Sequence, residues 1–147
     1  MPTRTARTAW DGGLMSGTGQ VELSSSGLAT FDVNFPKRAS EEADGTTSPE
    51  ELVGAAHSSC YSMSLAGLLE KAGATPQTLD VTADVSVGYD SEKKLGLTGI
   101  LLTVRAEVDG IDEAAFLDFA QAAKEGCPIS KALTGVKIEL DAALESA

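Results

Sequence analysis

Residues Ser48-Pro-Glu-Glu-Leu-Val-Gly-Ala-Ala-His-Ser-Ser-Cys60-Tyr-Ser-Met-Ser-Leu65 contain the signals that decide how this chain folds. Ser48 is a natural helix N-cap, a proline follows it, and Glu51 completes a Ser-x-x-Glu capping box. The helix is predicted to end near Ala72, with Gly73 as its C-cap. From 52 to 69 the charges vanish and small residues dominate. This pattern predicts a helix that is buried on all sides and that another backbone can approach closely.

Strand signals lie on both sides of this central helix. Short alternating runs separated by turn-forming Gly, Asp and Ser predict three strands before it, at 5–10, 19–23 and 28–35, followed by a polar loop at 36–47. The pattern after it predicts strands at 78–89 and 95–108, helices at 112–124 and 127–133, and a last strand at 136–140. The order βββ-α-ββ-αα-β predicts an α+β fold in which antiparallel sheets pack on the central helix.

Length and charge limit the kinds of protein this chain can be. Its 147 residues predict a single domain spanning 1–147. The net charge of −11 argues against nucleic acid, because phosphates are repelled by an acidic surface. The uncharged run 52–69 contains four serines and a histidine, so it is too polar for a membrane span. The N-terminus lacks the apolar region of a secretory signal, which favours a cytoplasmic protein.

The chain contains two cysteines, Cys60 and Cys127, which together can form one disulfide. Cys60 is surrounded on its helix by His57, Ser58, Ser59 and Ser62, although a core helix that needs only bulk has no use for such neighbours. Cys127 precedes a proline at the start of a short helix, where unpaired N–H groups and the helix dipole favour a thiolate. The structural alternative is that Cys60 packs as a small apolar residue and that Cys127 is only a substitute cap.

Other chemistries remain open at this point. His57 and Cys60 lie three residues apart on one helix face, so a cysteine-dependent hydrolase is a rival function. That spacing is nevertheless poor for a direct bond from the ring to the sulfur. A zinc site lacks any close-paired ligand spacing, so no metal is predicted. A third candidate function is that of a dimeric binding module whose cysteines are inert.

The run 48–65, followed by Gly126-Cys-Pro-Ile-Ser-Lys-Ala-Leu133, resembles the OsmC/Ohr family of peroxide-reducing proteins over nearly the whole chain. The resemblance implies an OsmC-like fold, an intertwined homodimer and a thiol peroxidase that uses no metal, haem, flavin or other cofactor. The implied substrates are organic hydroperoxides and hydrogen peroxide. The implied partner is an external dithiol reductant of the lipoyl type.

The resemblance also assigns site residues. Cys60 matches the peroxidatic cysteine and Cys127 the resolving one, so that a sulfenic acid on Cys60 condenses with Cys127 to a disulfide. Glu50 matches the carboxylate that holds an active-site arginine. Arg38 fits that arginine in the OsmC branch, with Lys37 as the alternative cation. A guanidinium beside the sulfur lowers the pKa of the thiol and stabilises the leaving oxygen.

The distance between Glu50 and Cys60 leads to a quaternary prediction. Ten residues of continuous helix separate them by about 15 Å along the axis. One chain can therefore hardly bring this carboxylate to its own sulfur. An antiparallel copy of the helix can, so Glu50 of one subunit is predicted to order the arginine beside Cys60 of the other.

Overall fold

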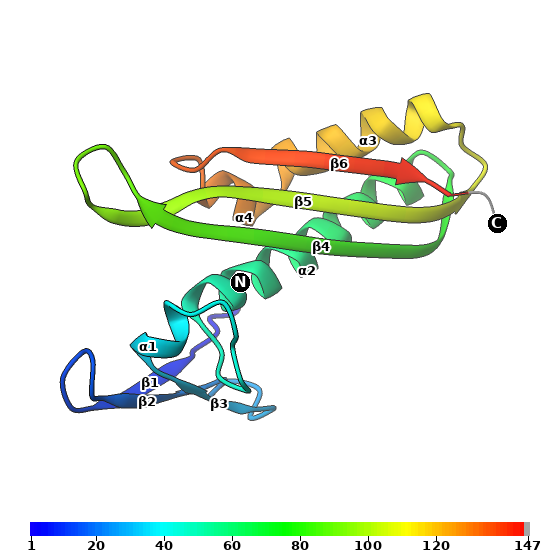
Figure 1. The fold of residues 1–147 in the computed structure, drawn as a ribbon. Coiled ribbons are helices and arrows are strands. Elements are labelled where there is room, and N and C mark those ends of the chain that lie inside the picture. Colours follow the sequence, from blue (N-terminus) through cyan, green and yellow to red (C-terminus); the bar gives the residue numbers. More distant parts are fainter. Residues whose placement is uncertain (146–147) are drawn as a thin grey trace. The chain divides into compact units, whose positions relative to one another are not determined.

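The computed structural model describes residues 1–145, and the chain divides into two compact units, Met1–Leu52 and Val53–Ala147. The element order is that predicted from the sequence, with one additional short helix (Figure 1). The elements are β1 (Arg7–Asp11), β2 (Thr18–Glu22), β3 (Thr30–Val33), α1 (Phe35–Arg38), α2 (Pro49–Lys71), β4 (Thr75–Tyr89), β5 (Leu95–Asp109), α3 (Glu113–Gly126), α4 (Pro128–Ala132) and β6 (Ile138–Leu144).

The first unit is built on a three-stranded antiparallel sheet in the order β1-β2-β3. Trp10 pairs with Gly19, and Val21 pairs with Phe31. No large apolar side chain between residues 1 and 52 is buried, and Trp10, Leu14 and Phe31 are exposed. This sheet therefore has no hydrophobic core of its own.

The segment at 36–47 is not entirely a loop, which corrects the sequence-based prediction. It begins inside α1, whose N-cap Asn34 accepts a hydrogen bond from the Lys37 amide at 2.9 Å. A proline occupies the first turn, where its missing N–H costs nothing. A single turn of helix is too short to show a periodic hydrophobic pattern, so periodicity does not indicate it. Arg38 is the last residue of this turn.

Helix α2 has the predicted caps. The Glu51 amide donates to the Ser48 hydroxyl at 3.1 Å. At the other end Gly73 adopts a φ of +81°, and the amide of Ala74 donates to the carbonyl of Leu69, which closes the helix with the expected C-cap. In the single chain only one side of the helix is fully buried, and the exposed residues of the other side include Ala55, Ala56, Ser59 and Met63.

The second unit contains a sheet in the order β4-β5-β6. Strands β4 and β5 form the predicted long antiparallel hairpin, but β6 lies parallel to β5, which corrects the expectation of purely antiparallel sheets. The reason is the connection: α3 and α4 form a crossover that returns the chain in the same direction, as parallel neighbours require. Figure 1 shows β6 beside β5, with α3 running along it.

The hydrophobic core of this second unit lies between α2, the sheet and α3. A row at helical spacing on α2 packs against alternate residues of β5, where every second side chain points to the same face. The buried members are Tyr61, Leu65 and Leu69 of α2, Leu102, Val104 and Ala106 of β5, and Phe116 and Ala123 of α3. Asp112 caps α3 as predicted, accepting from the Ala115 amide at 2.8 Å. Cys127 is also a buried member of this core and Cys60 packs against it, so both cysteines lie in a well-packed unit.

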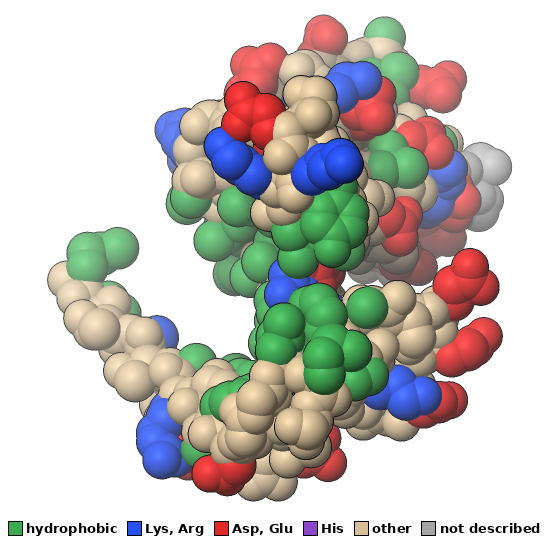
Figure 2. All heavy atoms as spheres, turned by 60° about the vertical axis from the view of Figure 1, so that its left-hand side comes forward, with side chains coloured by type: hydrophobic (Ala, Val, Ile, Leu, Met, Phe, Trp, Pro, Cys, Tyr) green, Lys and Arg blue, Asp and Glu red, His purple; other side chains and the backbone are tan. Residues whose placement is uncertain are grey.

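Hydrophobic side chains also remain at the surface, and Figure 2 shows some of them on the face that it draws. The large apolar side chains that are more than half exposed include Leu14, Met15 and Leu28 in the first unit and Met63 and Tyr89 in the second. Separately, no helix among residues 1–145 combines the length and the apolar character needed to cross a membrane.

Candidate functional site

Cys60 and Cys127 are brought together from distant parts of the chain. Cys60 lies in the middle of α2, where it is partly exposed, and Cys127 is fully buried between α3 and α4. Both are free thiols, and each influences the pKa of the other. The fold therefore supplies the proximity that a dithiol site requires.

The two thiols have different surroundings. Burial is the main effect on Cys60 and raises its pKa, an amide of α4 opposes this, and the sulfur of Cys127 adds to the rise. Burial alone also raises the pKa of Cys127, but the amide of Ser130, the Cys60 thiol and the Ser130 hydroxyl together bring it below its ordinary value. The surroundings of Cys127 therefore favour its thiolate, and those described for Cys60 favour its neutral thiol.

Cys127 is the N-cap residue of α4, as predicted. Its thiol forms no capping hydrogen bond, yet the amides of Ile129 and Ser130 help to lower its pKa. Unpaired amides and the helix dipole at the start of a helix have this effect on a sulfur.

His57 does not pair with Cys60. Its ring is fully buried, and its Nε2 lies 2.7 Å from the hydroxyl of Ser130, while Nδ1 has no hydrogen-bond partner among the described residues. Burial lowers the pKa of the imidazole, which favours the neutral ring. The contact with Ser130 was not predicted from the sequence. The available signal was that Ser130 follows Cys127 by three residues, in the first turn of α4.

Arg38 and Glu50 form a two-pronged ion pair. The guanidinium Nη2 lies 2.6 Å from one carboxylate oxygen, and Nε lies 3.2 and 3.1 Å from the two oxygens. Partial burial raises the pKa of Glu50, but its hydrogen bond with Arg38 and other nearby groups outweigh this, and the pKa is below its ordinary value. The same bond raises the pKa of Arg38. Such fork geometry fixes the plane of the guanidinium as well as its position.

Lys37, the alternative cation, pairs with a different carboxylate. Its ammonium pairs with Asp44, in the loop that follows α1. The residue that the Glu50 carboxylate holds is Arg38. The arginine–carboxylate pair lies in the first unit of the chain, and the two cysteines lie in the second.

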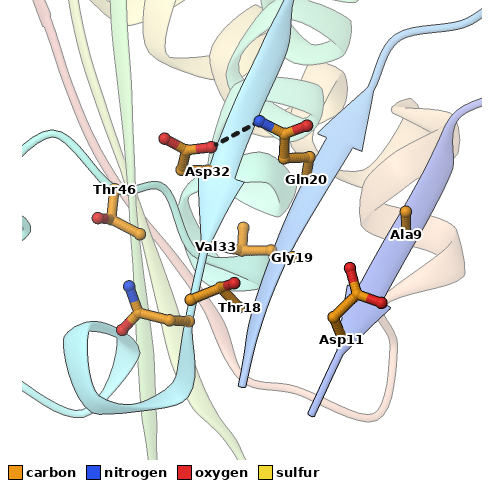
Figure 3. Close-up of a pocket in the computed structure, with 9 residues that line it drawn as sticks. Ala9, Asp11, Thr18, Gly19, Gln20, Asp32, Val33 and Thr46 are labelled. Atoms are coloured by element: carbon orange, nitrogen blue, oxygen red, sulfur yellow. Dashed lines mark hydrogen bonds between the residues drawn. The ribbon is translucent and has the colours of Figure 1, made fainter. Parts of the chain in front are cut away.

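Two hollows open on the first unit. One, of about 410 Å³, lies over the sheet and is mainly polar, with Gln20 donating to Asp32 at 3.1 Å (Figure 3). It contains none of the predicted site residues. The second, of about 300 Å³, is lined mostly by apolar side chains, including Trp10, Leu14 and Phe35, and Arg38 borders it. An apolar hollow thus adjoins the held guanidinium.

Among residues 1–145, no three His, Cys, Asp or Glu side chains gather closely enough to hold a metal ion.

Comparison with known proteins identifies the family. The OsmC-like protein family matches residues 42–141, a range that includes Glu50 and both cysteines. Peroxiredoxin OsmC of Escherichia coli is 40% identical over 137 residues, which cover 93% of each chain. This chain belongs to the OsmC-like family.

Solved structures agree with this assignment. An organic hydroperoxide resistance protein from Elizabethkingia anophelis superimposes with a TM-score of 0.78 at 25% identity, covering 99% of this chain and 98% of that one. The organic hydroperoxide resistance protein OhrB of Bacillus subtilis gives a TM-score of 0.74 at 26% identity, covering 94% and 97% of the two chains. The fold predicted from the sequence is confirmed as that of this family.

Proposed function

We propose that this protein is a cysteine-based peroxidase that reduces organic hydroperoxides, and hydrogen peroxide alongside them, to alcohols or water. The observation that carries this proposal is the adjacent pair of free thiols in a chain that is 40% identical to a peroxiredoxin. The hydrolase alternative is disfavoured, because the His57 ring is bonded to Ser130.

The proposed reaction has two steps. The Cys60 thiolate attacks one peroxide oxygen, the O–O bond breaks, and the other oxygen leaves as an alkoxide that takes up a proton. Cys60 is thereby oxidised to a sulfenic acid. Cys127 then attacks the Cys60 sulfur, so that a disulfide forms and water leaves. An external dithiol of the lipoyl type restores both thiols in a cytoplasmic setting.

The first step requires a cation beside Cys60, because burial raises the pKa of this thiol. Arg38 is our candidate, held by Glu50 in the geometry described above. We assign this pair to Cys60 of the partner subunit in a homodimer. Support comes from the exposed small-residue side of α2, which leaves room for a second helix, and from the coreless first sheet, which needs a covering surface.

The preference for organic peroxides rests on the hollow that borders Arg38. Its lining is mostly apolar and its volume is about 300 Å³, so it suits an alkyl or aryl substituent. The guanidinium at its edge provides the charge that stabilises the leaving alkoxide. Hydrogen peroxide lacks a group to fill this space and should react more slowly.

Intact-mass spectrometry with one equivalent of cumene hydroperoxide tests the function. The reduced protein should lose two hydrogens per chain as the disulfide forms. Cys60→Ser should abolish peroxide consumption, whereas Cys127→Ser should react once and gain one oxygen or more. A hydrolase or an inert binding protein would keep its mass, and normal turnover by Cys60→Ser would refute the assigned roles.

A further inference from the structure

The buried histidine of α2 takes no part in the peroxidase chemistry described above. His57 is completely inaccessible, and its one recorded hydrogen bond reaches Ser130, 73 residues further along the chain. Ser130 lies three residues after Cys127, in the first turn of the helix that Cys127 begins, and its amide and hydroxyl both act to lower the pKa of the Cys127 thiol. Ser130 therefore connects the buried ring of His57 on α2 with the turn that carries one of the two thiols.

The ring nitrogen of His57 that has no partner determines which group donates in the hydrogen bond between His57 and Ser130. Nδ1 of His57 is buried and has no partner among residues 1–145. A buried N–H without an acceptor is rarer and more costly than an unused lone pair. The proton of the neutral ring therefore lies on Nε2, which donates to the Ser130 oxygen. The Ser130 hydroxyl proton is then free to point at Cys127.

We propose that His57 and Ser130 are positioning residues for Cys127: the ring fixes the Ser130 hydroxyl as a donor, and this hydroxyl holds the Cys127 thiolate ready for disulfide formation. The inference rests on the proposed function, since it concerns the second step of that reaction. Its basis is the 2.7 Å bond, the unpartnered Nδ1 and the complete burial of both His57 and Cys127.

The step that this arrangement serves is the resolving one. The Cys127 thiolate attacks the sulfur of the Cys60 sulfenic acid, the S–S bond forms, and the S–O bond breaks. The oxygen leaves as hydroxide and takes a proton from solvent to become water. In the later reduction by a dithiol, a stabilised Cys127 thiolate is also the better leaving group, because thiols of lower pKa leave faster.

Other titratable groups approach Cys127 from the elements packed against it. Cys60 approaches from α2 and Tyr61 from the next residue of the same helix, and the pKa of Tyr61 is raised by burial and by the Cys127 sulfur. The Tyr61 hydroxyl donates to the Ala120 carbonyl at 2.9 Å and is not available to the thiolate. No Lys or Arg is recorded as influencing Cys127 within the described chain. Ser130 is therefore its side-chain donor besides Cys60.

The test separates the two chemical steps by single-turnover kinetics on the full-length protein. Sulfenic acid is trapped with dimedone, and disulfide is followed by intact mass after one equivalent of cumene hydroperoxide. Ser130→Ala should form the sulfenic acid at the wild-type rate but convert it to disulfide about tenfold more slowly, the effect of losing one hydrogen bond to a charged group. In a Cys60→Ser background, Ser130→Ala should also move thiolate absorbance to higher pH.

Matched variants distinguish positioning from simple packing. Ser130→Thr keeps the hydroxyl and should resolve normally. His57→Gln places an amide donor near the position of Nε2 and should largely preserve resolution, whereas His57→Asn reaches only to the position of Nδ1 and should behave like Ser130→Ala. Ser62→Ala is the control, because the Ser62 hydroxyl donates only to the Ser58 carbonyl of its own helix.

The outcomes of these experiments separate failure of the inference from failure of the proposed function. Equal resolution rates in wild type and Ser130→Ala, with an unchanged thiolate profile, would overturn the inference and leave the peroxidase intact. Should Ser130→Ala fail to fold, equal slowing by His57→Gln and His57→Asn would overturn it as well. Absence of any sulfenic acid in the wild type would instead reject the proposed function.

Discussion

The carboxylate of Glu50 does more than neutralise Arg38: it sets the plane of the guanidinium. Contacts from both Nε and Nη2 fix the side chain in two directions, and the other edge of the fork remains to face a substrate. Lysine has no such plane, because its ammonium is a point charge on a flexible stem. The identity of this residue as arginine therefore matters to the geometry of the proposed reaction.

We expect Arg38→Ala to slow the first attack of Cys60 on peroxide about a hundredfold or more, as the loss of an oxyanion-stabilising donor does elsewhere. The pH profile of Cys60 alkylation should move to higher pH, because the thiolate loses its cation. Arg38→Lys should recover only part of the rate. Stopped-flow measurement of the first turnover gives the rates directly.

Lys37→Ala is the matched control, since it removes a neighbouring cation that pairs with Asp44. Its rate and alkylation profile should stay at wild-type values. An unchanged profile in Arg38→Ala together with a changed one in Lys37→Ala would exchange the two assignments.

For single residues, sequence motifs predict which side chains belong to the candidate site but not all of the contacts that these side chains make. Glu50, Cys60 and Cys127 lie in motifs that carry the family resemblance, but no motif indicates that Glu50 pairs with Arg38 and that Lys37 pairs with Asp44. The contact between His57 and Ser130 joins residues 73 positions apart. Only the packing of α4 against α2 brings them together, and no local pattern reports it.

Among the elements, helix α2 has one buried and one exposed side, and the two sides differ in how much space surrounds their glycines. On the buried side, a Cβ added at Gly54 would lie 2.9 Å from the Ala83 carbonyl of β4, which is too close for any real contact. A Cβ added at Gly67 in the same helix would meet nothing within 4 Å. The first glycine allows helix and strand to approach, and the second has no such role within the chain.

The same substitution should therefore have opposite effects at these two glycines. Gly54→Ala should lower the free energy of unfolding by about 1–3 kcal/mol, because the backbones must separate to relieve overpacking. Gly67→Ala should raise it by up to about 1 kcal/mol through better helix propensity. Chemical denaturation followed by circular dichroism measures both, and destabilisation by Gly67→Ala would show that its surroundings are occupied.

The order of the elements was predictable because each has strong local signals, but their directions and interruptions were not. The alternation along β4 predicts that residue 87 lies on the core side with residue 85. A register shift between Ser86 and Val87 instead leaves Val87 exposed. Likewise, the parallel pairing of β6 depends on the path of the α3–α4 crossover, about which the residues of the strand itself carry no information.

For the whole molecule, the central proposal is that a dimer completes each site. The thiols and the ion pair that should activate them belong to separate units of one chain. With Arg38 and Glu50 paired within one subunit, both are expected to act on Cys60 of the partner subunit. Neither subunit would then contain a complete site.

Mixed dimers test this sharing. A dimer assembled from Glu50→Ala and Cys60→Ser subunits retains one Cys60, and its partner still supplies a normal Glu50. We expect about half of wild-type peroxidase activity from purified, differently tagged heterodimers. Activity no better than one site of the Glu50→Ala homodimer would show that the carboxylate serves the cysteine of its own chain.

The first sheet, which buries no large apolar side chain of its own, has a thermodynamic consequence. If a second subunit provides its covering surface, then mass action governs whether the segment carrying Arg38 stays in place. Peroxidase activity per chain should then decline as the enzyme is diluted below its dissociation constant, and added Cys60→Ser protein, which is inactive but can still pair, should restore it. Steady-state assays over a dilution series would measure this, and constant activity per chain down to demonstrated monomer would contradict it. Such an enzyme would have peroxide reduction tied to its own abundance in the cell.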